Sequence, residues 1–116
     1  MKRDMELIRL SLLEVEGEEP KPDLSAYSEE QKVYHMALCI EAGLVDGDIV
    51  KDGSGYPVGT VAIRLTWKGH ELLDAARNDT IWKKTVGQIK KAGVAITLPV
   101  LEDLLKKGAK ELLGLP

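Results

Sequence analysis

The residues best suited to chemistry are His35 and Cys39, four positions apart in a stretch that is predicted to be helical. This spacing would place both side chains on one side of the helix, as a nucleophile with its base or two metal ligands require. A structural metal needs about four ligands, yet the chain offers one more histidine, His70, and no second cysteine. We therefore interpret the pair as a surface histidine and a partly buried cysteine, and expect no metal, no cofactor and no catalytic site.

A glycine-rich stretch at residues 53–59 has the composition of a phosphate-binding loop. Such loops follow a strand and open a helix, often with a lysine. Here a predicted strand follows the glycines and no lysine occupies the matching place, so a hairpin turn is the better interpretation. The carboxylate pairs Glu29-Glu30 and Glu102-Asp103 fall in first helical turns, where they complement the helix dipole. The sequence predicts a protein that is not an enzyme.

Helical periodicity defines the N-terminal elements. Apolar residues recur at spacings of three and four over about residues 3–15. A second helix begins at Ser28, which forms a capping-box pattern with Gln31. Gly43 is expected to end this helix in the left-handed conformation.

Two strands are predicted after the second helix, at residues 45–51 and 58–66, joined by the glycine-rich turn. In the second strand, Val61, Ile63 and Leu65 alternate with more polar residues. Because successive side chains of a strand point to opposite faces, we expect these three on one buried face.

Three helices are predicted after the strands. Thr66 is expected to cap the first, at residues 67–77, while Asp79 or Thr80 begins the next and Thr97 begins the last. Trp67 lies away from the apolar face of its helix, so we expect the last two helices to cover it, within one chain or by exchange between two. The predicted state is a monomer or homodimer.

Helix, two-stranded ribbon and helix in this order predict an α+β fold, and two short motifs strengthen that prediction. They resemble the joints of bacterial winged-helix regulators, one between recognition helix and wing and one between wing and trailing helix. The motifs are Ala42-Gly43-Leu44 and Leu65-Thr66-x-x-Gly69-x-x-x-Leu73. The resemblance implies a winged helix-turn-helix-like domain with two additional C-terminal helices: a single domain over residues 1–116, with its core at about 3–77 and an extension at about 79–114.

A second resemblance covers nearly the whole chain. The first nine residues, Tyr34-His35 and the run from Thr66 to Trp82 are similar to an uncharacterised family of bacteria and their prophages, a domain of unknown function related to YjcQ-like proteins. This resemblance implies a bacterial or prophage setting and brings no activity with it.

DNA binding is the leading function implied by the fold. The second helix would enter the major groove and the wing would touch an adjacent groove. The predicted contacts are Gln31, Lys32, Tyr34, His35, Lys51 and Arg64. Acidic residues oppose this function, because Glu29, Glu30 and Glu41 on the same helix repel phosphate.

A protein-interaction adaptor is the alternative. Tyr34 and Leu38 form an apolar spot on the outward, otherwise acidic side of the second helix. The other interpretation of this spot is that the preceding loop, with Leu24 and Tyr27, folds over it.

Charge is unevenly distributed along the 116 residues, whose net charge is −3. Residues 17–51 carry −5 and residues 79–116 carry +3, the latter from seven lysines. Those lysines are either the solvated sides of amphipathic helices or a patch for nucleic acid or an acidic partner. With no apolar run of membrane length and one cysteine, the chain is expected to have no membrane partner and to be cytoplasmic.

Overall fold

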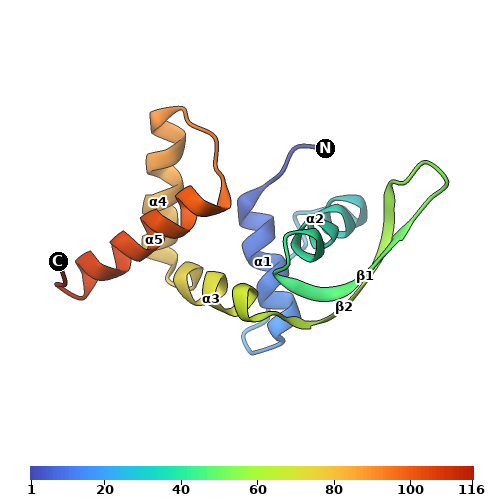
Figure 1. Cartoon of the computed structure of the whole chain (residues 1–116), viewed down its shortest axis with the longest axis horizontal. Helices are drawn as coiled ribbons and strands as arrows, with labels where there is room; N and C mark the ends of the chain where they lie inside the picture. Colours follow the sequence, from blue (N-terminus) through green and yellow to red (C-terminus); the bar gives the residue numbers. More distant parts are fainter. The chain divides into compact units, whose positions relative to one another are not determined.

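The computed structural model describes residues 1–116 and belongs to the α+β class, with five helices and one two-stranded antiparallel sheet (Figure 1). The elements follow one another as α1 (Met5–Glu16), α2 (Glu29–Glu41), β1 (Val45–Lys51), β2 (Pro57–Leu65), α3 (Trp67–Ala76), α4 (Asp79–Ala92) and α5 (Leu98–Leu112). They group into two compact units, Met1–Glu71 and Leu72–Pro116, with the boundary inside α3. We call these the N-terminal and C-terminal units.

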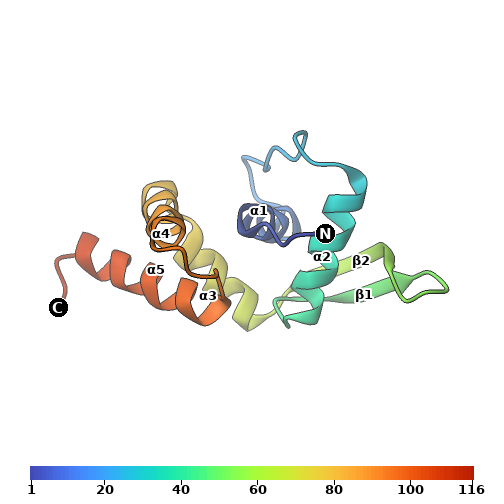
Figure 2. The same ribbon diagram turned by 90° about the horizontal axis from the view of Figure 1, so that it is seen from above.

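The first two helices begin and end at the residue types that the sequence indicates. Asp4 caps α1 by accepting from two backbone N–H groups, and Gly17 ends it with φ 74°. Ser28 and Gln31 form both hydrogen bonds of the predicted capping box of α2. Gly43 follows α2 with φ 73°, the left-handed conformation that glycine adopts without strain. The connection between α1 and α2 contains no helix or strand and arches over α1 in Figure 2.

The hairpin of β1 and β2 differs from the prediction in which residues it exposes. Val45 pairs with Leu65 at its base, and both are buried. The register then slips, so Gly47 pairs with Ala62 and leaves Ile63 as the extra residue of a β-bulge.

This slip inverts the alternation on the outer half of β2. Val61 now lies opposite the exposed Asp48, and Val61 and Ile63 are both more than half exposed. The expected buried face of Val61, Ile63 and Leu65 is therefore wrong except at Leu65, because a bulge restarts the count of inward and outward positions.

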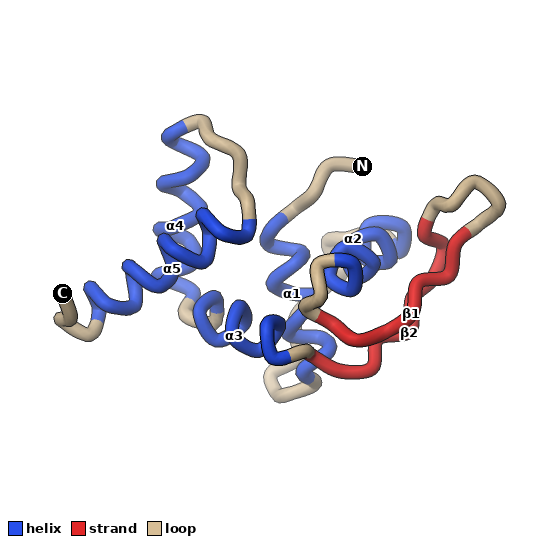
Figure 3. Tube along the Cα trace, viewed as in Figure 1, coloured by secondary structure: helices blue, strands red, loops and turns tan.

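The core of the N-terminal unit forms where α1, α2 and the base of the hairpin meet, and Figure 3 shows α2 beside the two strands. Its buried apolar residues are Met5, Leu7, Ile8, Leu12, Ala37, Cys39, Leu44, Val45 and Leu65. Thr66 connects the hairpin to α2 and α3. Its hydroxyl donates to Gly43 O at 2.5 Å and accepts from Gly69 N at 3.0 Å, as expected of the cap of α3. A side chain at Gly69 would collide with Leu44 O, so backbones touch here.

The C-terminal unit contains α4 and α5, which contact each other, together with the end of α3. Asn78, rather than the predicted Asp79 or Thr80, caps α4 by accepting from Ile81 N. Thr97 precedes α5 as expected but makes no side-chain capping hydrogen bond. The buried apolar residues of this unit are Leu72, Leu73, Ala76, Trp82, Ile89, Leu101 and Leu105.

The N-terminal unit does not cover the indole of Trp67. It is 80% exposed at the start of α3, so nothing in its own unit buries it. The expectation that the last two helices cover it, within one chain or by exchange between two, stays a prediction.

Candidate interaction surface

His35 is a buried structural residue rather than an outward contact. It is 1% exposed, its Nε2 accepts from Asp4 N at 2.9 Å, and its Nδ1 lies 2.8 Å from Gln31 O. Because one ring nitrogen accepts and the other must donate to a carbonyl, the arrangement requires the neutral Nδ1–H tautomer. His35 thus fastens the start of α1 to α2, and its prediction as a surface histidine and DNA contact is wrong. The sequence alone predicts His35 on the outward side of the helix because polar side chains are usually exposed to solvent.

Cys39 lies on the same buried side of α2 and is unsuited to nucleophilic chemistry. Its side chain is fully buried, and this burial raises the pKa of the thiol to about 12. Free cysteines tend to be buried, but nothing else in the sequence indicated that Cys39 is buried completely. No group of three potential ligands exists that could hold a metal ion.

Three of the predicted DNA contacts are engaged within the protein. The Gln31 side chain accepts from Ser28 N at 2.8 Å as part of the capping box. Lys32 Nζ lies 2.5 Å from Glu29 Oε1, and Arg64 Nη2 lies 2.6 Å from Asp46 Oδ2.

Lys51 is the exposed cation of the predicted set that has no acidic partner within ion-pair distance. Every side chain from Gln31 to Ile40 is buried or half-buried, so α2 offers little of the free polar face that base contacts need.

Tyr34 and Leu38 are both half-buried. Tyr34 stacks on Tyr56 from the hairpin tip, with ring centroids 5.9 Å apart, and the Tyr56 hydroxyl donates to Glu30 at 3.3 Å. A hairpin residue therefore lies against Tyr34, a contact between distant positions that helical spacing cannot predict.

The turn between the strands is held by one carboxylate. Asp52 Oδ1 accepts from the Ser54 hydroxyl at 2.7 Å, from Ser54 N at 2.9 Å and from Tyr56 N at 3.0 Å. These hydrogen bonds, that of the Ser54 side chain above all, lower the pKa of Asp52. The predicted hairpin turn is confirmed between the strands, although Pro57 to Gly59 already belong to β2, and the carboxylate that orders the turn stays charged.

Most of the strongly exposed large apolar side chains of the N-terminal unit lie on the hairpin and just beyond it. Five large side chains are more than half exposed there: Val50, Val58, Val61, Ile63 and Trp67. We call this set the apolar hairpin surface. The sequence did not reveal the exposure of Val61 and Ile63, because strand alternation predicted their burial and the bulge reverses the outer half of β2.

Charge divides between the two units. Residues 1–71 contain eight basic and fourteen acidic side chains, for a net charge of −6, whereas residues 72–116 contain eight basic and five acidic side chains, for +3. The apolar hairpin surface therefore belongs to the acidic unit. No helix combines the length and hydrophobicity that crossing a bilayer requires.

Comparison with known proteins identifies relatives without naming an activity. Residues 2–95 match the family described as "Hypothetical protein (DUF2513)". An uncharacterized protein of Haemophilus influenzae is 32% identical over 120 residues, which cover 98% of this chain and all of that protein. No solved structure matches.

Proposed function

This chain belongs to the DUF2513 family, and we propose that it is a non-enzymatic protein-interaction module whose N-terminal unit binds a basic, partly apolar segment of a partner protein. The observation that carries the proposal is the apolar hairpin surface. Monomeric soluble proteins rarely leave large apolar side chains gathered in the open unless they mark an interaction site.

Trp67 is the expected anchor of this interface. Tryptophan is enriched among residues that dominate binding energy, and this one is 80% exposed before any partner arrives. Ile63 is 67% exposed and lies four residues earlier in the chain. Burial of such side chains on binding removes apolar area from water, which supplies most of the driving force in protein association.

The charge of the unit selects the chemistry of the partner. A net charge of −6 steers basic segments toward the surface and repels nucleic acid and acidic proteins. Asp48 is exposed directly opposite Val61 in the hairpin, so an acidic group adjoins an apolar one. A partner segment that presents leucine together with lysine or arginine matches both the apolar side chains and the acidic charge of this surface.

Titration of the whole protein with two synthetic amphipathic helices tests the proposal. Each peptide is about 18 residues long with leucine on one face, and the other face is lysine in one peptide and glutamate in the other. We expect Ile63→Ser with Trp67→Ser to weaken binding of the lysine peptide by about tenfold or more. Val94→Ser with Val100→Ser, exposed apolar positions of the C-terminal unit, is the matched control and should leave this binding unchanged. Equal affinity of both variants for the lysine peptide would refute the assignment.

DNA binding is the second candidate, because a helix that leads directly into a two-stranded hairpin is the arrangement of a winged helix, and Lys51 is exposed on that hairpin. Titration of a mixed-sequence duplex at about 50 mM and about 200 mM salt tests it, since phosphate-driven binding weakens steeply between those conditions. If the hairpin contacts phosphate, Lys51→Ala lowers the affinity for every duplex and reduces its salt dependence. An unchanged salt dependence excludes the hairpin from DNA contact.

A further inference from the structure

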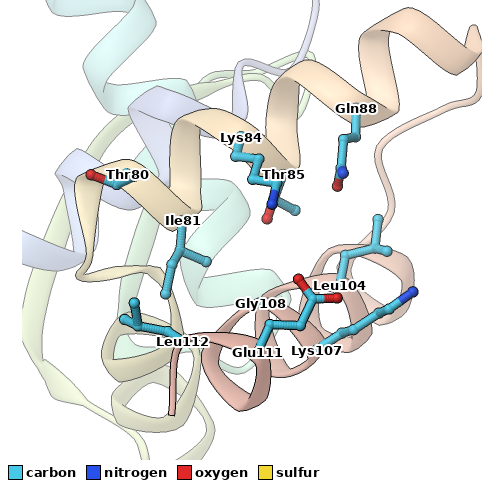
Figure 4. Close-up of a pocket in the computed structure, with 10 residues that line it drawn as sticks. All are labelled: Thr80, Ile81, Lys84, Thr85, Gln88, Leu104, Lys107, Gly108, Glu111 and Leu112. Carbon is cyan, nitrogen blue, oxygen red and sulfur yellow. The ribbon is translucent and has the colours of Figure 1, made fainter. Parts of the chain in front are cut away.

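The groove between α4 and α5 is a feature of the C-terminal unit that the hairpin proposal does not involve (Figure 4). One side of each helix lines it: Thr80, Ile81, Lys84, Thr85 and Gln88 on α4, and Leu104, Lys107, Gly108, Glu111 and Leu112 on α5. On each helix these residues recur at spacings of three and four and extend along about 12 Å. The groove has a volume of about 330 Å³ and is partly open to solvent.

The floor of the groove is apolar and only partly covered. Leu101 and Leu105 on one side of α5 are buried, but Leu104 and Ile81 in the groove are half-buried and Leu112 is 68% exposed. α5 therefore has a wider apolar stripe than its neighbours in the unit cover.

Gly108 lies in the middle of this stripe. A Cβ built at this position would come within 2.9 Å of Ile81 Cγ2, so its missing side chain lets α5 approach Ile81 on α4 closely.

The charged residues that line the groove are mostly positive. Lys84 on α4 and Lys107 on α5 are exposed and line it from opposite helices, against a single acidic lining residue, Glu111. Five more lysines of the unit are exposed on the same two helices: Lys83, Lys90, Lys91, Lys106 and Lys110. A ligand of this groove must therefore combine apolar groups, which contact the floor, with negative charge, which pairs with the lysines.

We propose that the groove binds an acidic amphipathic helix of a partner protein, which lies along α4 and α5 as a third helix. Two packed helices leave a furrow into which the side-chain ridge of a third can fit. Leucine-like side chains of the partner contact Ile81, Leu104 and Leu112, and its carboxylates pair with Lys84 and Lys107. A small molecule fits less well, because such ligands are usually enclosed on most of their surface. Duplex DNA would use the lysines and leave the apolar floor unused.

The glutamate and lysine peptides described above, titrated into the whole protein, test this site separately from the hairpin surface. We expect the glutamate peptide to bind, and Lys84→Glu with Lys107→Glu to weaken it by about tenfold. Lys90→Glu with Lys106→Glu changes the net charge equally on the same helices but outside the groove, and should weaken it less than about twofold. Leu112→Ser, at an exposed position, should also weaken the glutamate peptide.

Three outcomes overturn the proposal. Absence of glutamate-peptide binding to the unmodified protein removes the site. Equal weakening by the two lysine pairs shows diffuse attraction to the whole basic unit. Binding of a duplex of about 20 base pairs that is lost in both pairs and unchanged in Leu112→Ser assigns the lysines to nucleic acid. None of these outcomes depends on how the lysine peptide binds the hairpin.

Discussion

The two units use their polar side chains in opposite ways. In the N-terminal unit, His35, Gln31 and Arg64 are bonded within the protein, and apolar side chains of the hairpin face solvent. In the C-terminal unit the lysines face solvent, and the exposed apolar stripe lies in a groove between two helices. The units carry net charges of −6 and +3, and under the two proposals the first binds a basic partner and the second an acidic one. The polar residues that look most functional are structural, and the exposed apolar ones mark the candidate sites.

The largest effect is expected where backbones touch in the N-terminal unit. Gly69→Ala places a Cβ against Leu44 O, so the junction of α2, the hairpin and α3 must shift, and we expect a loss of about 3 kcal/mol in the free energy of unfolding. Urea denaturation of the whole chain measures it. A loss below about 1 kcal/mol would show that this junction is looser than the contact implies.

The buried thiol of Cys39, in the N-terminal unit, should make the stability of the protein depend on pH. Burial raises the pKa of its thiol from 9.0 to about 12, so the unfolded chain ionises first as pH rises. The stabilisation is complete below about pH 9 and is lost as pH approaches about 12. Between about pH 8 and about pH 11 the wild type should lose about 2 to 3 kcal/mol more than Cys39→Ala. Parallel losses in the two proteins would mean that the thiol is accessible.

The two histidines offer a direct contrast between a buried and an exposed polar residue. His35→Ala removes the bridge between Asp4 N and Gln31 O, and should cost about 2 kcal/mol. His70→Ala, at an exposed position of α3, should change stability by less than about 0.5 kcal/mol. Chemical denaturation of both variants decides whether His35 is the structural residue that its contacts indicate; similar values would contradict it.

A gain in stability is expected in the C-terminal unit. Gly87 lies within α4 with nothing within 4 Å of a Cβ built there. Gly87→Ala should therefore stabilise the protein by about 1 kcal/mol through helix propensity alone. Glycine is replaced by alanine here as in Gly69→Ala, but the expected change in the free energy of unfolding has the opposite sign. A loss of stability in Gly87→Ala would mean that another group packs closely against α4 at this position.

The sequence predicted the elements well because their signals are local. The capping box of Ser28 and Gln31, the left-handed Gly43 and the cap at Thr66 each depend on residues within about four positions, and all are present. Both strands were placed within a residue of their observed ends.

The candidate sites were harder to predict because they depend on contacts between distant residues. The buried His35 accepts a hydrogen bond from Asp4 N, 31 positions away, and Tyr34 is stacked on Tyr56 from the hairpin tip. The bulge at Ile63 exposes Val61 against the simple alternation of the strand. The assignment of DNA contacts to α2 remains a prediction, although its residues are less available than helical periodicity indicated.

The bulge implies that Val61 and Ile63 of the apolar hairpin surface can be turned away from solvent without changing either side chain. In a regular register Ile63 would pair with Gly47 and Val61 with Ile49, and both would turn toward α2. A Cβ at Gly47 would collide with Val61 O, so glycine is required for the observed register. We expect Gly47→Ala to favour the regular pairing, visible by NMR as loss of the cross-strand contact to Ala62. One methyl group, added at a residue that is not part of the proposed interface, would then remove Val61 and Ile63 from the surface that a partner contacts.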